Sequence, residues 1–149
     1  MLLLAAQIND ARKAVFTMVR LLIADSSGPV REGIKNILSD EEDILVNGEA
    51  ASLDETVERI GEQIFDIVVM DASLSHGGIM RIIGLVKEIL PHVKVIVLNP
   101  YGEEIYCEKA KKAGAAFCLS KKDLPTQLIP AIRSLLDGVT KRKGGLLST

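Results

Sequence analysis

From Val19 onward, short apolar runs alternate with amphipathic stretches, and this alternation restricts the fold more than any other feature of the chain. Five repeats can be counted. A strand followed by a helix, repeated in this way, is typical of a parallel sheet with helices on both faces. At 149 residues the chain is long enough for one domain with a real core, but short for two. The predicted strands are 20–24, 44–50, 65–70, 93–98 and 116–120, and the predicted helices begin near 29, 52, 79, 103 and 124, the last ending near 136.

Composition excludes several classes of protein. Hydrophobic residues make up 48% and charged residues 26%, which is typical of a soluble globular protein. A net charge of −2 provides no basic surface for nucleic acid, so we expect no direct nucleic-acid binding by this chain. The apolar opening 1–6 is too short to cross a membrane or to form the core of a signal peptide. We therefore expect a cytoplasmic protein with no membrane contact.

The two cysteines, Cys107 and Cys118, show no metal-binding or redox spacing. They form no CxxC pair and have no neighbouring histidine pair, so neither a zinc site nor a redox dithiol is predicted. We interpret both as core residues in a reducing compartment.

Charged residues follow three of the five predicted strands. Asp25 follows the first strand, Asp71 the third and Lys121 the fifth. Ligand crevices in open parallel sheets lie beyond the carboxyl ends of the strands, so these groups are predicted to converge at one edge. Taken singly, either aspartate could be an ordinary polar residue that precedes a helix. Three matching strand ends favour a functional site.

The segment Leu21 to Gly33, together with the strand ends at Asp71 and Lys121, resembles the receiver domains of bacterial two-component response regulators. The similarity covers about residues 19–138. It is greatest to receiver domains that precede helix-turn-helix output domains. It implies a flavodoxin-like (βα)5 fold, a doubly wound parallel sheet with strand order 2-1-3-4-5. Residues 139–149 are then a tail or linker. Residues 1–18 form an extension with apolar residues at helical spacing, which is either an accessory helix or sequence upstream of a natural start at Met18.

The resemblance also implies residue roles. Asp71 would accept a phosphoryl group from a histidine kinase or phosphotransfer protein, Lys121 would contact that group, and Asn99 would occupy the switch position after the fourth strand. Mg²⁺ would be held by Asp25, Asp71 and the backbone carbonyl of Ser73, with Ser26 a weak or lost ligand. A carboxylate can act as a nucleophile toward phosphorus when metal and a cation neutralise the transferring oxygens.

Four departures from the family pattern surround this predicted site. Ser26 replaces the second acid of the metal-binding pair, and a hydroxyl is a poor substitute for a carboxylate on Mg²⁺. Asn99 replaces the usual serine or threonine, Cys118 stands at the aromatic switch position, and the loop 75–78 lacks the usual proline. These changes predict a weakened Mg²⁺ site.

Two signalling functions remain open at this point, and a third hypothesis is an enzyme or cofactor-binding protein. The first is a receiver domain of a phosphorelay, phosphorylated on Asp71; the second is a pseudo-receiver that acts as a protein-interaction module without phosphate. A small flavodoxin-like enzyme or cofactor binder is less favoured, because no Walker motif, GxGxxG or catalytic triad is recognisable, so we expect no enzyme beyond self-catalysed phosphotransfer and dephosphorylation. A homodimer would form through the face made by the helix 103–113, the strand 116–120 and the helix 124–136.

Overall fold

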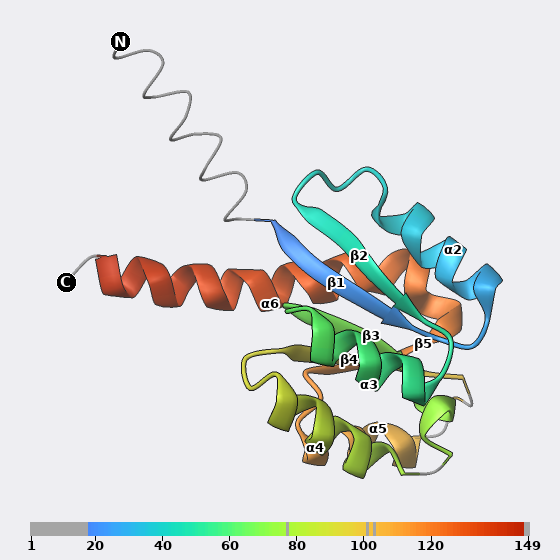
Figure 1. Ribbon diagram of the computed structural model, residues 1–149. Helices are drawn as coiled ribbons and strands as arrows, with labels where there is room; N and C mark the ends of the chain where they lie inside the picture. Colours follow the sequence, from blue (N-terminus) through green and yellow to red (C-terminus); the bar gives the residue numbers. More distant parts are fainter. Residues whose placement is uncertain (1–17, 77, 101, 103, 148–149) are drawn as a thin grey trace.

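The computed structural model describes residues 18–76, 78–100, 102 and 104–147, and it contains a five-stranded parallel sheet in the order β2-β1-β3-β4-β5 (Figure 1). This order confirms the predicted fold class. The predicted extension falls almost entirely on residues 1–17, outside the described residues. The strands are β1 Val19–Ala24, β2 Ile44–Ala50, β3 Ile67–Asp71, β4 Lys94–Asn99 and β5 Phe117–Ser120. The helices are α2 Gly28–Leu38, α3 Leu53–Glu62, α4 Ile79–Ile89, α5 Glu104–Ala113 and α6 Leu124–Leu147, with short 3-10 turns at Ala72–Ser75 and Lys121–Asp123.

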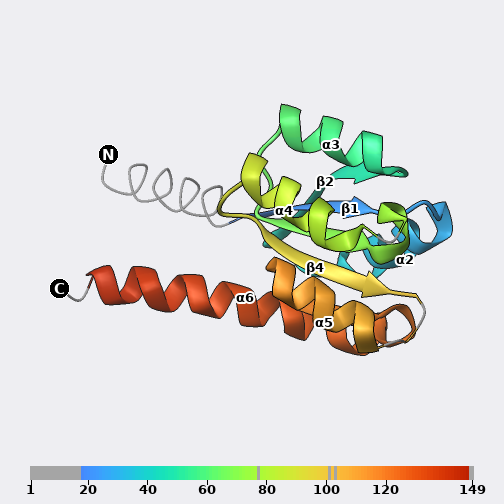
Figure 2. The ribbon, with the colours of Figure 1, turned by 90° about the horizontal axis from the view of Figure 1, so that it is seen from below.

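The helices cover both faces of the sheet (Figure 2). Alternate residues of β1 face opposite sides: Leu22 contributes to one apolar cluster, while Leu21 and Ile23 contribute to the other. The first cluster includes side chains of α3, α4 and α5, and the second includes side chains of α2 and α6. Because both faces are covered, the central strands are mostly apolar, with their polar residues near the strand ends, as expected for a parallel sheet.

Local sequence signals set several helix ends. The Ser27 hydroxyl accepts a hydrogen bond from the Val30 N–H at 3.2 Å and caps α2. The Ser52 hydroxyl likewise accepts from the Glu55 N–H at 3.1 Å and caps α3. Gly114, with φ of 111°, takes the left-handed conformation that ends α5.

The last helix differs from the prediction. A helix end was expected between 136 and 138, but α6 continues through Gly138 to Leu147 and extends beyond the sheet (Figure 1). A glycine inside a helix costs only about 1 kcal/mol relative to alanine, so a single glycine does not end a helix. Pro130 also lies inside α6, which begins at Leu124.

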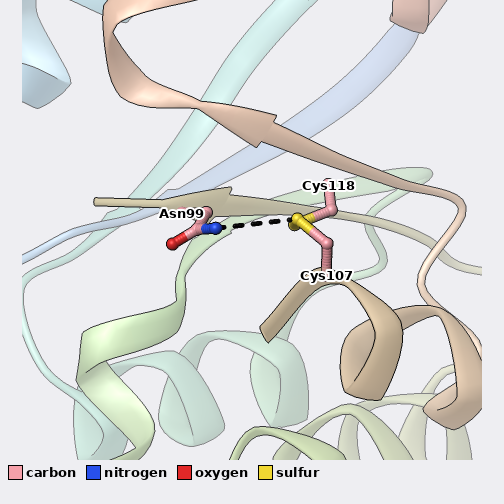
Figure 3. The surroundings of a disulfide bond; sticks show 3 residues. All are labelled: Asn99, Cys107 and Cys118. Atoms are coloured by element: carbon pink, nitrogen blue, oxygen red, sulfur yellow. Dashed lines mark hydrogen bonds between the residues drawn. A yellow bond between two sulfur atoms is a disulfide. The ribbon is translucent and has the colours of Figure 1, made fainter. Parts of the chain in front are cut away.

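The interpretation of Cys107 and Cys118 as core residues was wrong. Cys107 in α5 and Cys118 in β5 are joined by a disulfide, with their Cα atoms 5.4 Å apart (Figure 3). Both are only partly buried, so neither is a fully enclosed core residue. The chain returns from α5 directly into the adjacent β5, and this tertiary contact places the two residues side by side although 11 positions separate them.

Candidate functional site

The three charged groups predicted from the strand ends lie together at the carboxyl edge of the sheet. Asp25 directly follows β1, Asp71 is the last residue of β3, and Lys121 directly follows β5. Lys121 Nζ lies 2.8 Å from Asp25 Oδ2 and 3.1 Å from Asp71 Oδ2. One ammonium group therefore pairs with two carboxylates from different strands.

Asp71 is held by donors from the turn that follows it. Its side chain is 2% exposed, and its Oδ1 accepts a hydrogen bond from the Ser73 N–H at 3.1 Å. Its Oδ2 accepts hydrogen bonds from the Ser73 hydroxyl at 2.7 Å and from Lys121 Nζ at 3.1 Å. The carboxylate is thus oriented by its own strand-to-helix turn, and one of its oxygens is shared between a hydroxyl and a cation.

Asp25 is fully buried and anchored through its backbone. Its N–H donates to the Ala50 carbonyl at 2.9 Å, and its carbonyl accepts from Arg31 Nη1 at 2.6 Å. The Ser27 N–H donates to Oδ1 at 2.9 Å. Oδ2 faces Lys121 as an ion pair, but within the described part of the chain no donor meets hydrogen-bond geometry at this buried oxygen. This buried oxygen therefore keeps acceptor capacity beside the ion pair with Lys121.

Lys121 carries the opposite charge into this site. Burial lowers the pKa of its ammonium group, but the close ion pair with Asp25, the hydrogen bond to Asp71 and the negative charges of both acids outweigh burial, so the pKa is raised above its ordinary value. Lys121 therefore stays charged at neutral pH. With both carboxylates ionised, the three groups carry a net charge of −1, which favours a cation.

Arg31 and the Ser73 hydroxyl are site residues that the sequence reasoning missed. Arg31 lies on α2 and links the Asp25 carbonyl to Glu49, to which its Nε donates at 3.1 Å. Arg31 stands within the segment that resembles receivers, but its contact with Asp25 depends on how α2 packs. The Ser73 hydroxyl, at 2.7 Å from Asp71, is a local contact whose only signal was the short polar residue two positions after the acid.

Asp25, Asp71 and Lys121 together form the acid cluster. Ser26 lines a cavity next to this cluster. The cavity has a volume of about 680 Å³ and is lined by Ser26, 51–54, Ser73, Leu74 and His76. Ser26 is exposed, so a carboxylate at this position would reach solvent and the cavity without a burial cost. The serine presents only a neutral hydroxyl there.

Asn99 ends β4 at the same edge of the sheet and is 4% exposed. Its amide Nδ2 donates a hydrogen bond to Cys107 Sγ at 3.7 Å (Figure 3). Asn99 therefore contacts α5 directly, at the sulfur that takes part in the disulfide. Cys118, at the predicted switch position of β5, is the other half of that disulfide.

The fit of the site to Mg²⁺ rests on its oxygen donors. In the described residues, no group of three His, Cys, Asp or Glu side chains is arranged to hold a metal ion. Mg²⁺, however, usually takes only one or two protein carboxylates and completes its shell with water and phosphate oxygens. Asp25 and Asp71 supply two. The Ser73 carbonyl accepts one hydrogen bond, from the His76 N–H at 3.2 Å, and retains a second lone pair. These residues fit Mg²⁺, with fewer charges than an acidic pair after β1 would give.

Comparison with known proteins gives the family. Residues 21–133 match the response regulator receiver domain. The response regulator UvrY of Escherichia coli is 34% identical over 121 residues, covering 81% of this chain and 56% of that protein. The oxygen regulatory protein NreC of Staphylococcus haemolyticus is 30% identical over 124 residues, covering 82% of this chain and 57% of that protein.

Solved structures show the same fold. A LuxR-family two-component response regulator from Aurantimonas superposes with a TM-score of 0.73 at 26% identity, covering 81% of this chain and 86% of that one. The receiver domain of the putative response regulator NarL from Mycobacterium tuberculosis gives a TM-score of 0.69 at 23% identity, covering 83% and 97%.

This chain belongs to the response regulator receiver domain family of two-component systems. It spans about half the length of the curated relatives that it matches. Its resemblance to receiver domains, expected from the strand ends, is confirmed. In the part of the chain that the structure describes, no helix is both long and apolar enough to cross a lipid bilayer.

Proposed function

We propose that this domain is a phosphoacceptor in a phosphorelay, and that Asp71 receives a phosphoryl group from a histidine kinase or phosphotransfer protein. The observation that carries the proposal is the pairing of one lysine with two buried carboxylates at the carboxyl edge of the sheet. Three groups from three strands meet at one point, and this arrangement supplies both a nucleophile and a counter-charge.

The chemistry follows from these positions. An oxygen of Asp71 attacks phosphorus, the bond from phosphorus to the donor nitrogen breaks, and the donor imidazole leaves as an acyl phosphate forms on Asp71. Lys121 already lies at Oδ2 and can neutralise charge on the transferring oxygens. Because the Ser73 hydroxyl also donates to Oδ2, this hydrogen bond must be released before that oxygen can attack.

Mg²⁺ would neutralise charge on the phosphoryl oxygens when it is bound. Asp25, Asp71 and the Ser73 carbonyl are the groups that would hold it. Ser26 contributes no charge, so we infer that Mg²⁺ binds more weakly here than it would beside two acids after β1.

The test is phosphorylation of the purified chain by a small-molecule phosphodonor in the presence of Mg²⁺, followed by intact-protein mass spectrometry. We expect the mass to rise by one phosphoryl group in the wild type and not in Asp71→Asn. Binding of the phosphoryl analogue beryllofluoride, measured with and without Mg²⁺, provides a second readout that does not require a stable acyl phosphate.

The matched control is Asp54→Asn. Asp54 is an exposed acid that lines the neighbouring cavity, and among the described residues Lys121 forms its ion pairs with Asp25 and Asp71 instead. It should leave phosphorylation and beryllofluoride binding unchanged. If the wild type takes up neither ligand, the phosphoacceptor proposal fails, and a module that acts without phosphate becomes the better reading.

A further inference from the structure

The disulfide joins helix α5 to strand β5, close to the carboxyl edge of the sheet where Asp71 lies. Cys107 lies in the first half of α5, and Cys118 lies in β5, two residues before the strand ends. Their Cα separation of 5.4 Å is within the range usual for disulfides, so the backbone holds the two residues at bonding distance. Both side chains are partly exposed, so the bond is not sealed inside the core.

Apolar packing holds α5 less firmly than it holds α4. Of the ten residues of α5, all of which the structure describes, only Ala110 is buried. By contrast, α4 buries four large or medium apolar side chains, namely Ile79, Ile82, Ile83 and Val86. Burial of apolar area is the main force that keeps a surface helix on a sheet. The disulfide therefore adds a covalent link to a helix whose own buried apolar surface is small.

The attachment is unevenly distributed along α5. Its C-terminal end is fixed by Ala110 and by the turn at Gly114, whose carbonyl accepts a hydrogen bond from Lys87 at 3.3 Å. Its first turns carry the exposed Ile105, and the disulfide at Cys107 links them covalently to the sheet. Opening the disulfide would consequently release the N-terminal half of the helix first.

This half of α5 also contacts the switch position. The Asn99 amide donates to Cys107 Sγ, and the position of that sulfur is fixed by its bond to Cys118 (Figure 3). Asn99 pairs in register with Ser120, the residue that immediately precedes Lys121. A change at the disulfide would thus reach the carboxyl edge of the sheet through the contact between Cys107 and Asn99.

We propose that Cys107 and Cys118 form a reversible thiol–disulfide site, whose oxidised form holds α5 on the sheet and whose reduced form releases the first half of that helix. The reductant is a dithiol. One of its thiolates attacks one sulfur of the pair and releases the other as a thiolate, which leaves a mixed disulfide. The second thiol of the reductant then attacks the reductant's own sulfur in that mixed disulfide and releases the remaining cysteine, so that two cysteine thiols form while the dithiol becomes a disulfide. Two electrons and two protons pass from the dithiol to the protein. The proposal does not depend on phosphorylation of Asp71.

The test equilibrates the full chain, without denaturant, in buffers of graded dithiothreitol oxidation state. Alkylation of thiols and intact mass spectrometry measure the fraction reduced, and amide hydrogen exchange measures local opening in the same samples. We expect both thiols to appear together and to disappear again on reoxidation. On reduction, exchange in peptides covering 104–109 should accelerate by about tenfold or more, because a helix end with little buried surface opens at low cost.

Peptides from α4 and β3 serve as internal references and should not change. Cys107→Ser and Cys118→Ser should each show the fast exchange of the reduced protein under every redox condition. If either variant fails to fold, the reduced wild type still decides the question. Equal exchange of α5 in the oxidised and reduced proteins would overturn the role of the disulfide as a latch. A bond that resists dithiothreitol until the whole domain unfolds would overturn its reversibility.

Discussion

Replacing Lys121 with methionine tests whether two buried acids depend on a single cation. Lys121→Met keeps a side chain of similar shape and removes the ammonium group. Asp25 and Asp71 are 0% and 2% exposed, and each places its Oδ2 within about 3 Å of Lys121 Nζ. Removing one partner of a buried ion pair costs about 3–5 kcal/mol, because the remaining charge is left uncompensated. Since Lys121 itself is 24% exposed, we expect the lower end, about 3 kcal/mol.

Urea unfolding at pH 7 in the presence of a chelator measures this loss. With a slope of about 2 kcal/mol/M, a loss of 3 kcal/mol lowers the unfolding midpoint by about 1.5 M. The matched control is Lys122→Met, which removes the neighbouring exposed ammonium group. It should change the free energy of unfolding by less than about 0.5 kcal/mol.

Two further measurements check the cause. Asp25→Asn in the Lys121→Met background removes one of the two unpaired charges, so the double variant should recover much of the lost stability. Mg²⁺ should stabilise Lys121→Met more than the wild type, because it no longer competes with an ammonium group; at 100 times its Kd it contributes about 2.7 kcal/mol. If Lys121→Met unfolds at the same urea concentration as Lys122→Met, the two carboxylates do not depend on this cation and the reasoning is refuted.

Three smaller predictions concern residues around the site and one distant ion pair. Ser26→Asp should tighten Mg²⁺ binding by about tenfold, measured by calorimetry, and speed phosphorylation of Asp71; no change in either would show that Ser26 does not limit the metal site. Ser73→Ala removes a hydrogen bond to the attacking oxygen, worth about 1.5–3 kcal/mol for a charged acceptor, and should raise the initial phosphorylation rate by about tenfold; a slower rate would mean that the hydroxyl assists transfer. The hydrogen bond from Arg133 lowers the pKa of Asp43, so Asp43→Asn should cost less than about 1 kcal/mol at pH 7. This difference should be fully present above about pH 4 and should decline as the pH falls further, through the lowered pKa of the folded state; a constant difference in urea midpoint would contradict the ion pair.

The sequence predicted the acid cluster because strand position alone determines where these side chains lie. Each of Asp25, Asp71 and Lys121 follows or ends an apolar run that can only be a buried strand, and the carboxyl ends of parallel strands share one edge. The contacts of Arg31 and of the Ser73 hydroxyl were not predictable in the same way. They depend on side-chain directions at the start of α2 and in the turn after β3, which apolar periodicity does not specify.

The disulfide shows a second limit of sequence reasoning. A strand and the helix before it are adjacent in any repeated βα fold, so the distance between α5 and β5 was foreseeable. Whether Cys107 and Cys118 point toward each other depends on the rotation of α5 about its axis, which is poorly determined when a helix buries little apolar surface. CxxC and metal-binding patterns identify cysteines that are close in sequence. They do not identify cysteine pairs that only tertiary packing brings together.

The disulfide changes how the switch positions should be understood. In a receiver domain a conformational change requires that the phosphoryl group bind one state of the domain better than another. Cys118 has no ring to move, and in the oxidised protein its sulfur is bonded to α5, while Asn99 contacts the same disulfide. The proposed phosphorylation of Asp71 would then meet a β5 and an α5 that are already tied together. The predicted dimer face, which includes both elements, would accordingly be set by the oxidation state of the cysteines before it is set by phosphate, so the two modifications would act in sequence on one surface.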